Sequence, residues 1–221
     1  MKKRRYRKKK RAELEEQTRL RIVASAVAVH GTVGPSQSSI SAIADHAGVR
    51  RSTVYRHFPD ERALFTACSS HWMAENPVPD ITRWAAIHDF TERLSLALHE
   101  LYGYYRRNQR MLANVFRDEA TMPIVREMLG GFRSYLAAAR TVLVQSPVDE
   151  ASGRIREAAI GHALSFAVWR SLAMEQGLDD DECARLMCLL IQACQSESCL
   201  DGGDGKLDRP SRNPVSKPGR L

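Results

Sequence analysis

Apolar residues recur with helical spacing over most of the chain, and the strict alternation that is typical of half-buried strands is hard to find. The first run predicts a helix over 13–29, with an apolar face formed by Leu14, Ile22, Ala26 and Val29. Later runs predict helices over 60–74, 81–107, 109–119, 123–144, 150–175 and 179–195. The pattern therefore predicts an all-α protein.

Residues 38–58 have the pattern of two short helices joined by a tight turn. The first has an apolar face with spacing i, i+3, i+4 and i+7, formed by Ile40, Ile43, Ala44 and Ala47. The hydroxyl of Ser39 is placed to cap the free N–H groups of this helix. Gly48 follows it, and glycine tolerates the left-handed conformation that ends a helix.

The second helix of the pair is basic and polar outside its apolar face. Val54 and Phe58 face inward at i and i+4, and the other faces carry Arg50, Arg51, Ser52, Thr53, Tyr55, Arg56 and His57. A helical hairpin with a solvated basic face would have the same spacing. No acidic residue interrupts 46–59, however, which favours a helix-turn-helix whose second helix meets phosphates and base edges.

Four short motifs carry a family resemblance: ISAIA at 40–44, AGV at 47–49, TVYRHF at 53–58 and ALF at 63–65. Through them, the span from about Leu14 to Trp72 resembles the DNA-binding domain of the TetR family of bacterial repressors. The rest of the chain resembles this family in layout only. The resemblance implies a C-terminal helical domain that binds a ligand and forms the dimer.

Some of the expected DNA contacts fix the position of the protein on the duplex. Ser39 offers its hydroxyl and a helix N-terminus to a phosphate, and Ser41 faces outward toward the groove edge. The resemblance implies that Tyr55 and His57 contact the DNA backbone, which sets register without specifying sequence.

Other residues are expected to read sequence, because Arg50, Arg51, Ser52 and Thr53 lie at the helix end that enters the major groove in such motifs. Arg51 is the first candidate for base reading, since arginine pairs two donors with the two acceptors of guanine. Thr53 offers a methyl and a hydroxyl to thymine or phosphate, and Arg56 suits a base or a phosphate.

Two positions depart from the family pattern. Family members commonly have Ser where this chain has Arg50, so capping of the second helix falls to water or to Ser52. They often have Lys where this chain has Glu61, which leaves the following Arg62 as a doubtful phosphate contact.

The positive charge is concentrated at one end of the chain. Nine Lys or Arg lie within residues 1–11, and without them the net charge of +7 becomes −2. We expect a disordered arm there that attracts a polyanion and raises affinity and salt sensitivity. The resemblance implies a minor-groove or phosphate contact, whereas a tail without specific contacts is the alternative.

The expected organisation is a basic arm at 1–11, a helix-turn-helix domain at 12–76, an effector-binding and dimerisation domain at 77–199, and a disordered tail at 200–221. The break NPVPD at 76–80 marks the boundary. No apolar run reaches a membrane span, and no signal peptide is evident. Five cysteines without CxxC pairs agree with a cytoplasmic protein.

The resemblance implies a pocket for a small, apolar effector in the C-terminal domain, where aromatic residues and a few polar groups share helix faces. Ordinary core packing is the alternative explanation for most of these aromatic residues. The candidate pocket residues are Trp84, His88, Tyr102, Tyr105, Phe116, Phe132, His162, Phe166 and Trp169. By resemblance, the last two long helices form a homodimer, and their apolar surface at residues such as Ala158, Leu189 and Leu190 agrees with this. Burial of these helices within a monomer would explain the same pattern.

Catalysis is not expected, since the chain shows no nucleophile elbow, cysteine-protease signature or phosphate-cradling glycine loop. His88 and Glu92 form a lone pair at i and i+4, which predicts no metal site, and no cofactor is expected. The sequence thus predicts a ligand-responsive repressor that binds a pseudo-palindromic double-stranded operator. An activator, a ligand-independent DNA binder and, less favoured, a helical enzyme or scaffold are the alternatives.

Overall fold

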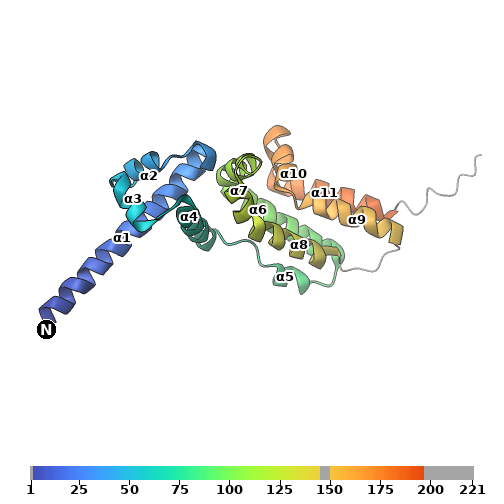
Figure 1. Cartoon of the computed structure of the whole chain (residues 1–221). Coiled ribbons are helices and arrows are strands. Elements are labelled where there is room, and N and C mark those ends of the chain that lie inside the picture. Colours follow the sequence, from blue (N-terminus) through green and yellow to red (C-terminus); the bar gives the residue numbers. More distant parts are fainter. Residues whose placement is uncertain (1, 145–149, 197–221) are drawn as a thin grey trace, which may run out of the picture.

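The computed structural model describes residues 2–144 and 150–196, and every regular element within these ranges is helical. Four helices form an N-terminal bundle: α1 (Lys2–Val33), α2 (Ile40–His46), α3 (Arg51–His57) and α4 (Glu61–Glu75). Seven more form a C-terminal bundle: α5 (Ile81–Ala85), α6 (Phe90–Asp118), α7 (Pro123–Met128), α8 (Gly130–Val144), α9 (Glu150–Ala163), α10 (Phe166–Arg170) and α11 (Asp180–Ser196). Figure 1 shows the two bundles side by side. The all-α prediction is confirmed.

The N-terminal bundle has its own buried core, in which the middle of α1 packs on α2 and α4. Ile22 and Ala26 are fully buried, and Val54 and Phe58 of the second short helix are almost so, as their spacing predicts. Leu14, expected on the same face of α1, is 54% exposed. The N-terminal part of α1 projects beyond the other helices of the bundle (Figure 1).

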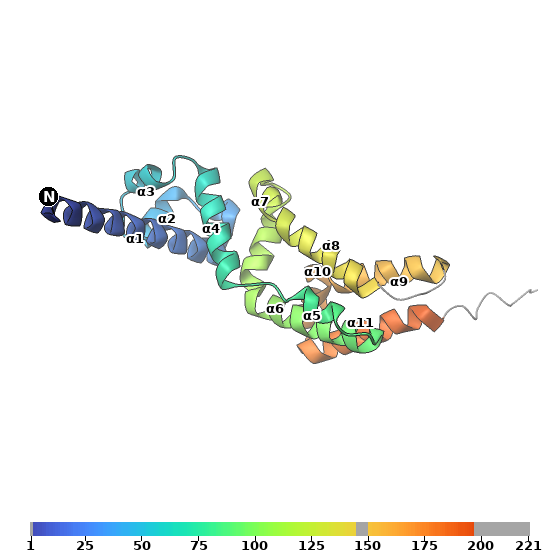
Figure 2. The same cartoon turned by 90° about the horizontal axis from the view of Figure 1, so that it is seen from below.

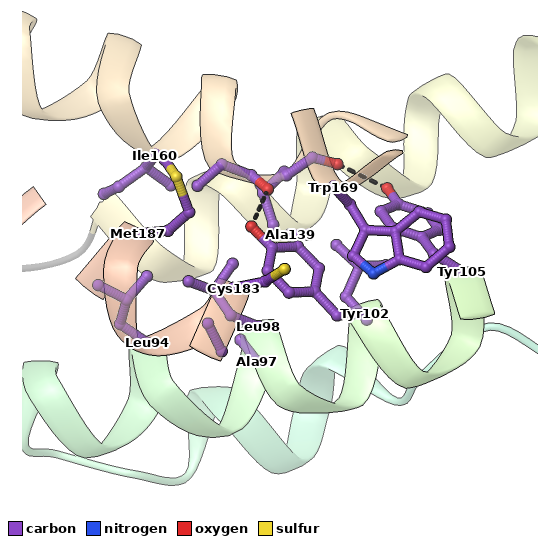
Figure 3. Close-up of a cluster of buried hydrophobic side chains, with 14 of the residues drawn as sticks. Leu94, Ala97, Leu98, Tyr102, Tyr105, Ala139, Ile160, Trp169, Cys183 and Met187 are labelled. Atoms are coloured by element: carbon purple, nitrogen blue, oxygen red, sulfur yellow. Dashed lines mark hydrogen bonds between the residues drawn. The ribbon is translucent and has the colours of Figure 1, made fainter. Parts of the chain in front are cut away.

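The C-terminal bundle is centred on α6, whose apolar face meets α8, α9 and α11. Two tyrosines of α6 donate hydrogen bonds to carbonyls at the C-terminal end of α9 (Figure 3). Tyr102 donates to the carbonyl of Ala163 (2.9 Å), and Tyr105 donates to that of Leu164 (2.6 Å). Carbonyls at a helix C-terminus have no partner within the helix, so these buried hydroxyls satisfy them. Core packing thus places both rings away from solvent.

The boundaries of several helices differ from the predictions. The helix expected over 81–107 is two helices, because the Asp89 side chain accepts from the Glu92 N–H (2.7 Å) and caps a new helix there. The helix expected separately over 109–119 is the C-terminal part of α6, which ends at Asp118. The segment 123–144 breaks at Leu129, and 150–175 breaks at Ser165, whose hydroxyl caps α10.

Residues 2–11, expected as a disordered arm, form the first turns of α1, and residues 6–11 are exposed. Lys9 and Arg11 pair with Glu13 (3.8 Å) and Glu15 (3.2 Å) one turn further on, and lysine and arginine are good helix formers. Figures 1 and 2 show α1 projecting beyond α2 and α3. The tail at 200–221 lies outside the described residues. None of the described helices is long and apolar enough to cross a bilayer.

Candidate DNA-reading face and ligand cavity

The turn between α2 and α3 has the geometry that its residues predict. The hydroxyl of Ser39 accepts a hydrogen bond from the Ala42 N–H (3.1 Å), and Gly48 ends the turn region with φ of 62°. Arg50 occupies the N-cap position of α3 but makes no side-chain cap, which agrees with the absence of the usual serine. The helix-turn-helix is therefore formed, but the N-terminus of α3 has no side-chain cap.

The outer side of α3 is basic. Arg50, Arg51, Ser52, Tyr55 and Arg56 are exposed, as are Ser39 and Ser41 on α2, whereas Thr53 and His57 are half-buried. The structure thus brings seven of the nine predicted DNA contacts to exposed positions on one pair of helices. The Nε2 atom of His57 is buried and has no hydrogen-bond partner within the described residues.

Arg51, the predicted base reader, lies over its neighbour one turn along α3. Its guanidinium donates to the Tyr55 hydroxyl (3.1 Å) and lies 5.5 Å from the centre of that ring. Both side chains are exposed, so this contact costs little to break. The contact places the guanidinium beside Tyr55 on the exposed side of α3.

A cavity of about 420 Å³ lies where the two bundles meet. Its walls come from α1 (Val27, His30), α4 (Phe65, Cys68, Ser69, Trp72), α6 (Tyr104, Met111, Leu112, Val115), α7 (Val125, Met128) and α8 (Phe132, Tyr135), with further residues from the connecting segments. A ligand held here would touch the N-terminal bundle and the C-terminal bundle together.

Of the nine residues predicted to line an effector pocket, only Phe132 lines this cavity. Phe116 and Phe166 line a second hollow between α6, α8 and α10, together with Arg117, Arg140 and Arg170. The other six lie elsewhere, as core residues or as exposed residues: Trp84, Tyr102, Tyr105, Trp169, His88 and His162.

The four core aromatics use their polar atoms for internal hydrogen bonds. Trp84 donates to Glu100 (2.8 Å) and Trp169 donates to Asp180 (3.0 Å), while both tyrosines bind α9 carbonyls. His88 is exposed because it lies in the break between α5 and α6. His162 is exposed on the outer side of α9. Sequence periodicity identified the buried faces but not the cavity.

His30 and Cys68, which the sequence did not single out for the cavity, form a buried polar pair on its wall. The imidazole Nδ1 lies 3.7 Å from the Cys68 Sγ, and the ring stacks on Phe65 with 4.9 Å between centres. Burial lowers the pKa of His30 to about 4, against a raising effect of Asp118, and burial raises the pKa of Cys68 to about 11. Both side chains are therefore uncharged at neutral pH.

The end of α1 is held by the end of α6. Asn114 donates to the carbonyls of His30 (3.0 Å) and Gly31 (3.1 Å), and Arg117 donates to that of Val33 (2.9 Å). Together with Asp118, which binds the same segment, these α6 residues form what we call the α6 clamp. It joins the N-terminal bundle to α6, a helix that lines the cavity.

A second link between the bundles joins α4 to α7. Arg62 of α4 donates to Glu127 of α7 at 2.6 Å, so the residue expected as a doubtful phosphate contact is engaged within the protein. Both side chains are exposed, and a pair of this kind contributes little free energy on its own. Its position matters more, because α7 forms one wall of the cavity.

The exposed apolar surface of α9 and α11 lies at the far end from α3. Ile155, Leu189 and Leu190 are 52%, 58% and 51% exposed, with Ala158 and Ala193 exposed nearby. Contacts between α9 and α11 place these side chains on neighbouring helices. An apolar surface at this location is what a subunit interface needs.

Comparisons with known proteins agree with this arrangement. A sequence model described as "Bacterial regulatory proteins, tetR family" matches residues 22–68, which span the middle of α1 through most of α4. No curated protein matches the chain.

Solved structures with the same fold include a TetR-like transcriptional regulator from Rhodococcus sp. RHA1 (TM-score 0.61, 19% identity, 83% of this chain and 96% of that one). A TetR-family regulator from Mesorhizobium loti (0.58, 17%, 82% and 96%) is also similar. A third is Bacillus subtilis FadR in complex with stearoyl-CoA (0.52, 21%, 78% and 96%). The family model thus matches the segment that contains the helix-turn-helix, and these solved structures share the fold of the chain.

Proposed function

We propose that this regulator binds a pseudo-palindromic operator as a dimer and leaves it when a small, mostly apolar molecule enters the cavity between its bundles. The single observation that carries the proposal is the position of the cavity. Its walls include α1 and α4, which support the reading helix, as well as α6, α7 and α8. A ligand in the cavity would therefore be in direct contact with the N-terminal bundle, which carries the reading helix.

The reading helix would enter the major groove with its N-terminal end. Arg51 there has the two donors that pair with guanine, and it needs only to leave the Tyr55 hydroxyl to reach a base. The helical extension at 2–11 adds positive charge near the same bundle, which attracts the duplex without specifying its sequence.

Release requires that the ligand bind more tightly to a conformation with poor operator affinity than to the DNA-bound one. The α6 clamp and the Arg62–Glu127 pair are the contacts through which a change at the cavity would move α1 and α4. The FadR structure with stearoyl-CoA supports the idea that a protein of this fold holds a ligand with an apolar chain.

Fluorescence anisotropy with the DNA upstream of the protein's own gene tests the DNA part of the proposal. Wild type should prefer this duplex over a scrambled one, and Arg51→Ala should lose the preference. Arg110→Ala, which removes an exposed arginine from α6, should behave as wild type. Equal binding of both duplexes by wild type would contradict sequence-specific recognition of this DNA. A failure to bind either duplex at low salt would contradict the proposal that the protein is a DNA-binding regulator.

An activator or a ligand-independent regulator would keep the same DNA contacts. The cavity favours ligand control over the ligand-independent alternative. The cavity wall pairs the His30 imidazole with the Cys68 thiol, and the pKa of this thiol is raised to about 11 by burial. Such a thiol is a poor nucleophile at neutral pH, which disfavours an enzyme.

A further inference from the structure

The polar groups on the wall of the cavity are all uncharged. No Lys, Arg, Asp or Glu is found among the described residues that line it. Its polar side chains include an imidazole, a thiol, an amide, a serine hydroxyl and two phenols, contributed by His30, Cys68, Asn76, Ser69, Tyr104 and Tyr135. The imidazole is neutral at pH 7 because burial lowers its pKa to about 4.

A charged ligand group would have no counter-ion in such a cavity. Moving a carboxylate or phosphate out of water is costly unless a cation or several strong donors replace its hydration. The volume of about 420 Å³ is also toward the lower end of the range for small-molecule sites, so a nucleotide-bearing ester would have to leave most of its atoms outside.

Tyr135, a residue of the cavity wall, has a buried hydroxyl that is unsatisfied within the described residues. Its ring is fixed by neighbours, since it stacks on Phe132 (6.1 Å between centres) and meets Trp84 edge-on (6.5 Å). A buried hydroxyl without a partner is unfavourable, so an acceptor on a ligand would relieve a cost already present in the protein.

We propose that the cavity takes an uncharged molecule with an elongated apolar body and one oxygen atom that accepts a hydrogen bond from the Tyr135 hydroxyl. A fatty alcohol or a fatty-acid methyl ester has this chemistry, whereas the free carboxylate does not. The inference rests on the proposed function for its regulatory meaning, but binding to the cavity is measurable without DNA.

Isothermal titration of the full chain at pH 7 with decyl alcohol, methyl decanoate and decanoate tests the ligand class. The alcohol and the ester should bind at least tenfold more tightly than decanoate. Equal or tighter binding of decanoate would overturn the proposal, as would the failure of both neutral probes to bind.

Variants locate the binding site. Tyr135→Phe should weaken alcohol binding about three- to tenfold, the reduction expected for one hydrogen bond. Tyr102→Phe removes the same atom from a hydroxyl in the core, away from the cavity, and should leave alcohol affinity unchanged. Val115→Phe fills part of the cavity and should weaken binding of both neutral probes. Unchanged alcohol affinity in Tyr135→Phe, or in Val115→Phe, would place the ligand elsewhere and overturn the proposal.

Operator release separates this inference from the proposed function. If the neutral probes bind but do not lower operator affinity, the ligand class stands and ligand-controlled release fails. If DNA binding is sequence-specific but no neutral probe binds, the proposed DNA reading stands and the ligand class is wrong.

Discussion

Asp118, the last residue of α6, accepts a hydrogen bond of 2.8 Å from the backbone N–H of Ser36, which lies in the turn between α1 and α2. The carboxylate also receives Arg117 (2.8 Å), and Asp118 is only 3% exposed. Gly34 makes room for this contact: its φ is 93°, and a Cβ there would collide with the Arg117 guanidinium. The turn leading to the reading helices is therefore built against α6.

Removing this carboxylate should loosen the connection between the bundles. Asp118→Ala leaves the Ser36 N–H without its acceptor, and we expect the free energy of unfolding to fall by about 1–3 kcal/mol. Chemical denaturation followed by circular dichroism measures this change. Asp181→Ala, which removes an exposed carboxylate from α11, serves as the control and should change stability by less than about 0.5 kcal/mol. Equal effects of the two substitutions would contradict the role of the α6 clamp.

The same variant should weaken ligand control of DNA binding. Asp118→Ala removes one hydrogen bond of the α6 clamp, so fewer contacts remain through which a ligand in the cavity could move α1. Ligand should therefore change operator affinity less in Asp118→Ala than in wild type. Anisotropy titrations with and without ligand measure the ratio of the two affinities. A ratio equal to that of wild type would show that coupling passes through another contact, such as the Arg62–Glu127 pair.

Stability should depend on pH through His30. Its pKa is lowered from 6.5 to about 4 in the folded protein, so between these values the unfolded chain binds a proton that the folded chain does not. Folding should therefore lose stability as the pH falls from about 6.5 to about 4, by roughly 3 kcal/mol in total. The lowered pKa of Asp118 adds a decrease at more acid pH, below its ordinary value of 3.8.

Denaturation midpoints measured across this pH range test the role of His30. His30→Gln should flatten the profile between pH 6.5 and 4, whereas His46→Gln, at an exposed position on α2, should retain the wild-type slope. A wild-type slope in His30→Gln would mean that other groups cause the pH dependence.

The basic extension of α1 should control the salt sensitivity of DNA binding rather than its specificity. Replacing Lys8, Lys9 and Lys10 by Ala keeps the helix, because alanine is the best helix former. We expect the slope of log affinity against log salt to fall by about 0.9 for each phosphate that the variant no longer neutralises, with affinity reduced alike for operator and scrambled duplexes. A reduction confined to the operator would instead indicate base reading by this segment.

The apolar surface on α9 and α11 should hold the dimer. Leu189→Glu places a charge on a side chain that is 58% exposed and should convert dimers to monomers, with reduced operator affinity, as measured by light scattering and anisotropy. Met174→Glu alters another exposed apolar side chain outside α9 and α11 and should leave the dimer intact. Monomers in wild type, or dimers in Leu189→Glu, would exclude this interface.

Local patterns in the sequence predicted the helix-turn-helix well, because its caps and turn depend on neighbouring residues such as Ser39 and Gly48. The same kind of signal was present at Asp89, but the apolar spacing across it favoured one long helix, and the cap decided the outcome. The helical spacing of apolar residues does not reveal this break, because α5 and α6 both bury apolar residues in the same core.

The cavity could not be read from helical spacing, because it depends on how two bundles meet. His30 and Cys68 belong to the N-terminal bundle, and periodicity marks them only as residues of its core. Aromatic residues such as Tyr105 and Trp169 were expected in the pocket since they combine apolar and polar atoms. Their partners, Leu164 and Asp180, lie more than ten residues away in sequence and could be identified only from the fold.

Selection of binding sequences from a random pool of duplex DNA tests the central claim most directly, since it requires no knowledge of the target gene. The full chain should enrich a pseudo-palindrome whose half-sites are separated by about one helical turn or a multiple of it, as two α3 helices of a dimer demand. Arg51→Ala should lose or change the preference at a guanine of each half-site. Enrichment of no sequence by the wild-type protein, under salt at which it binds DNA, would contradict an operator-reading function.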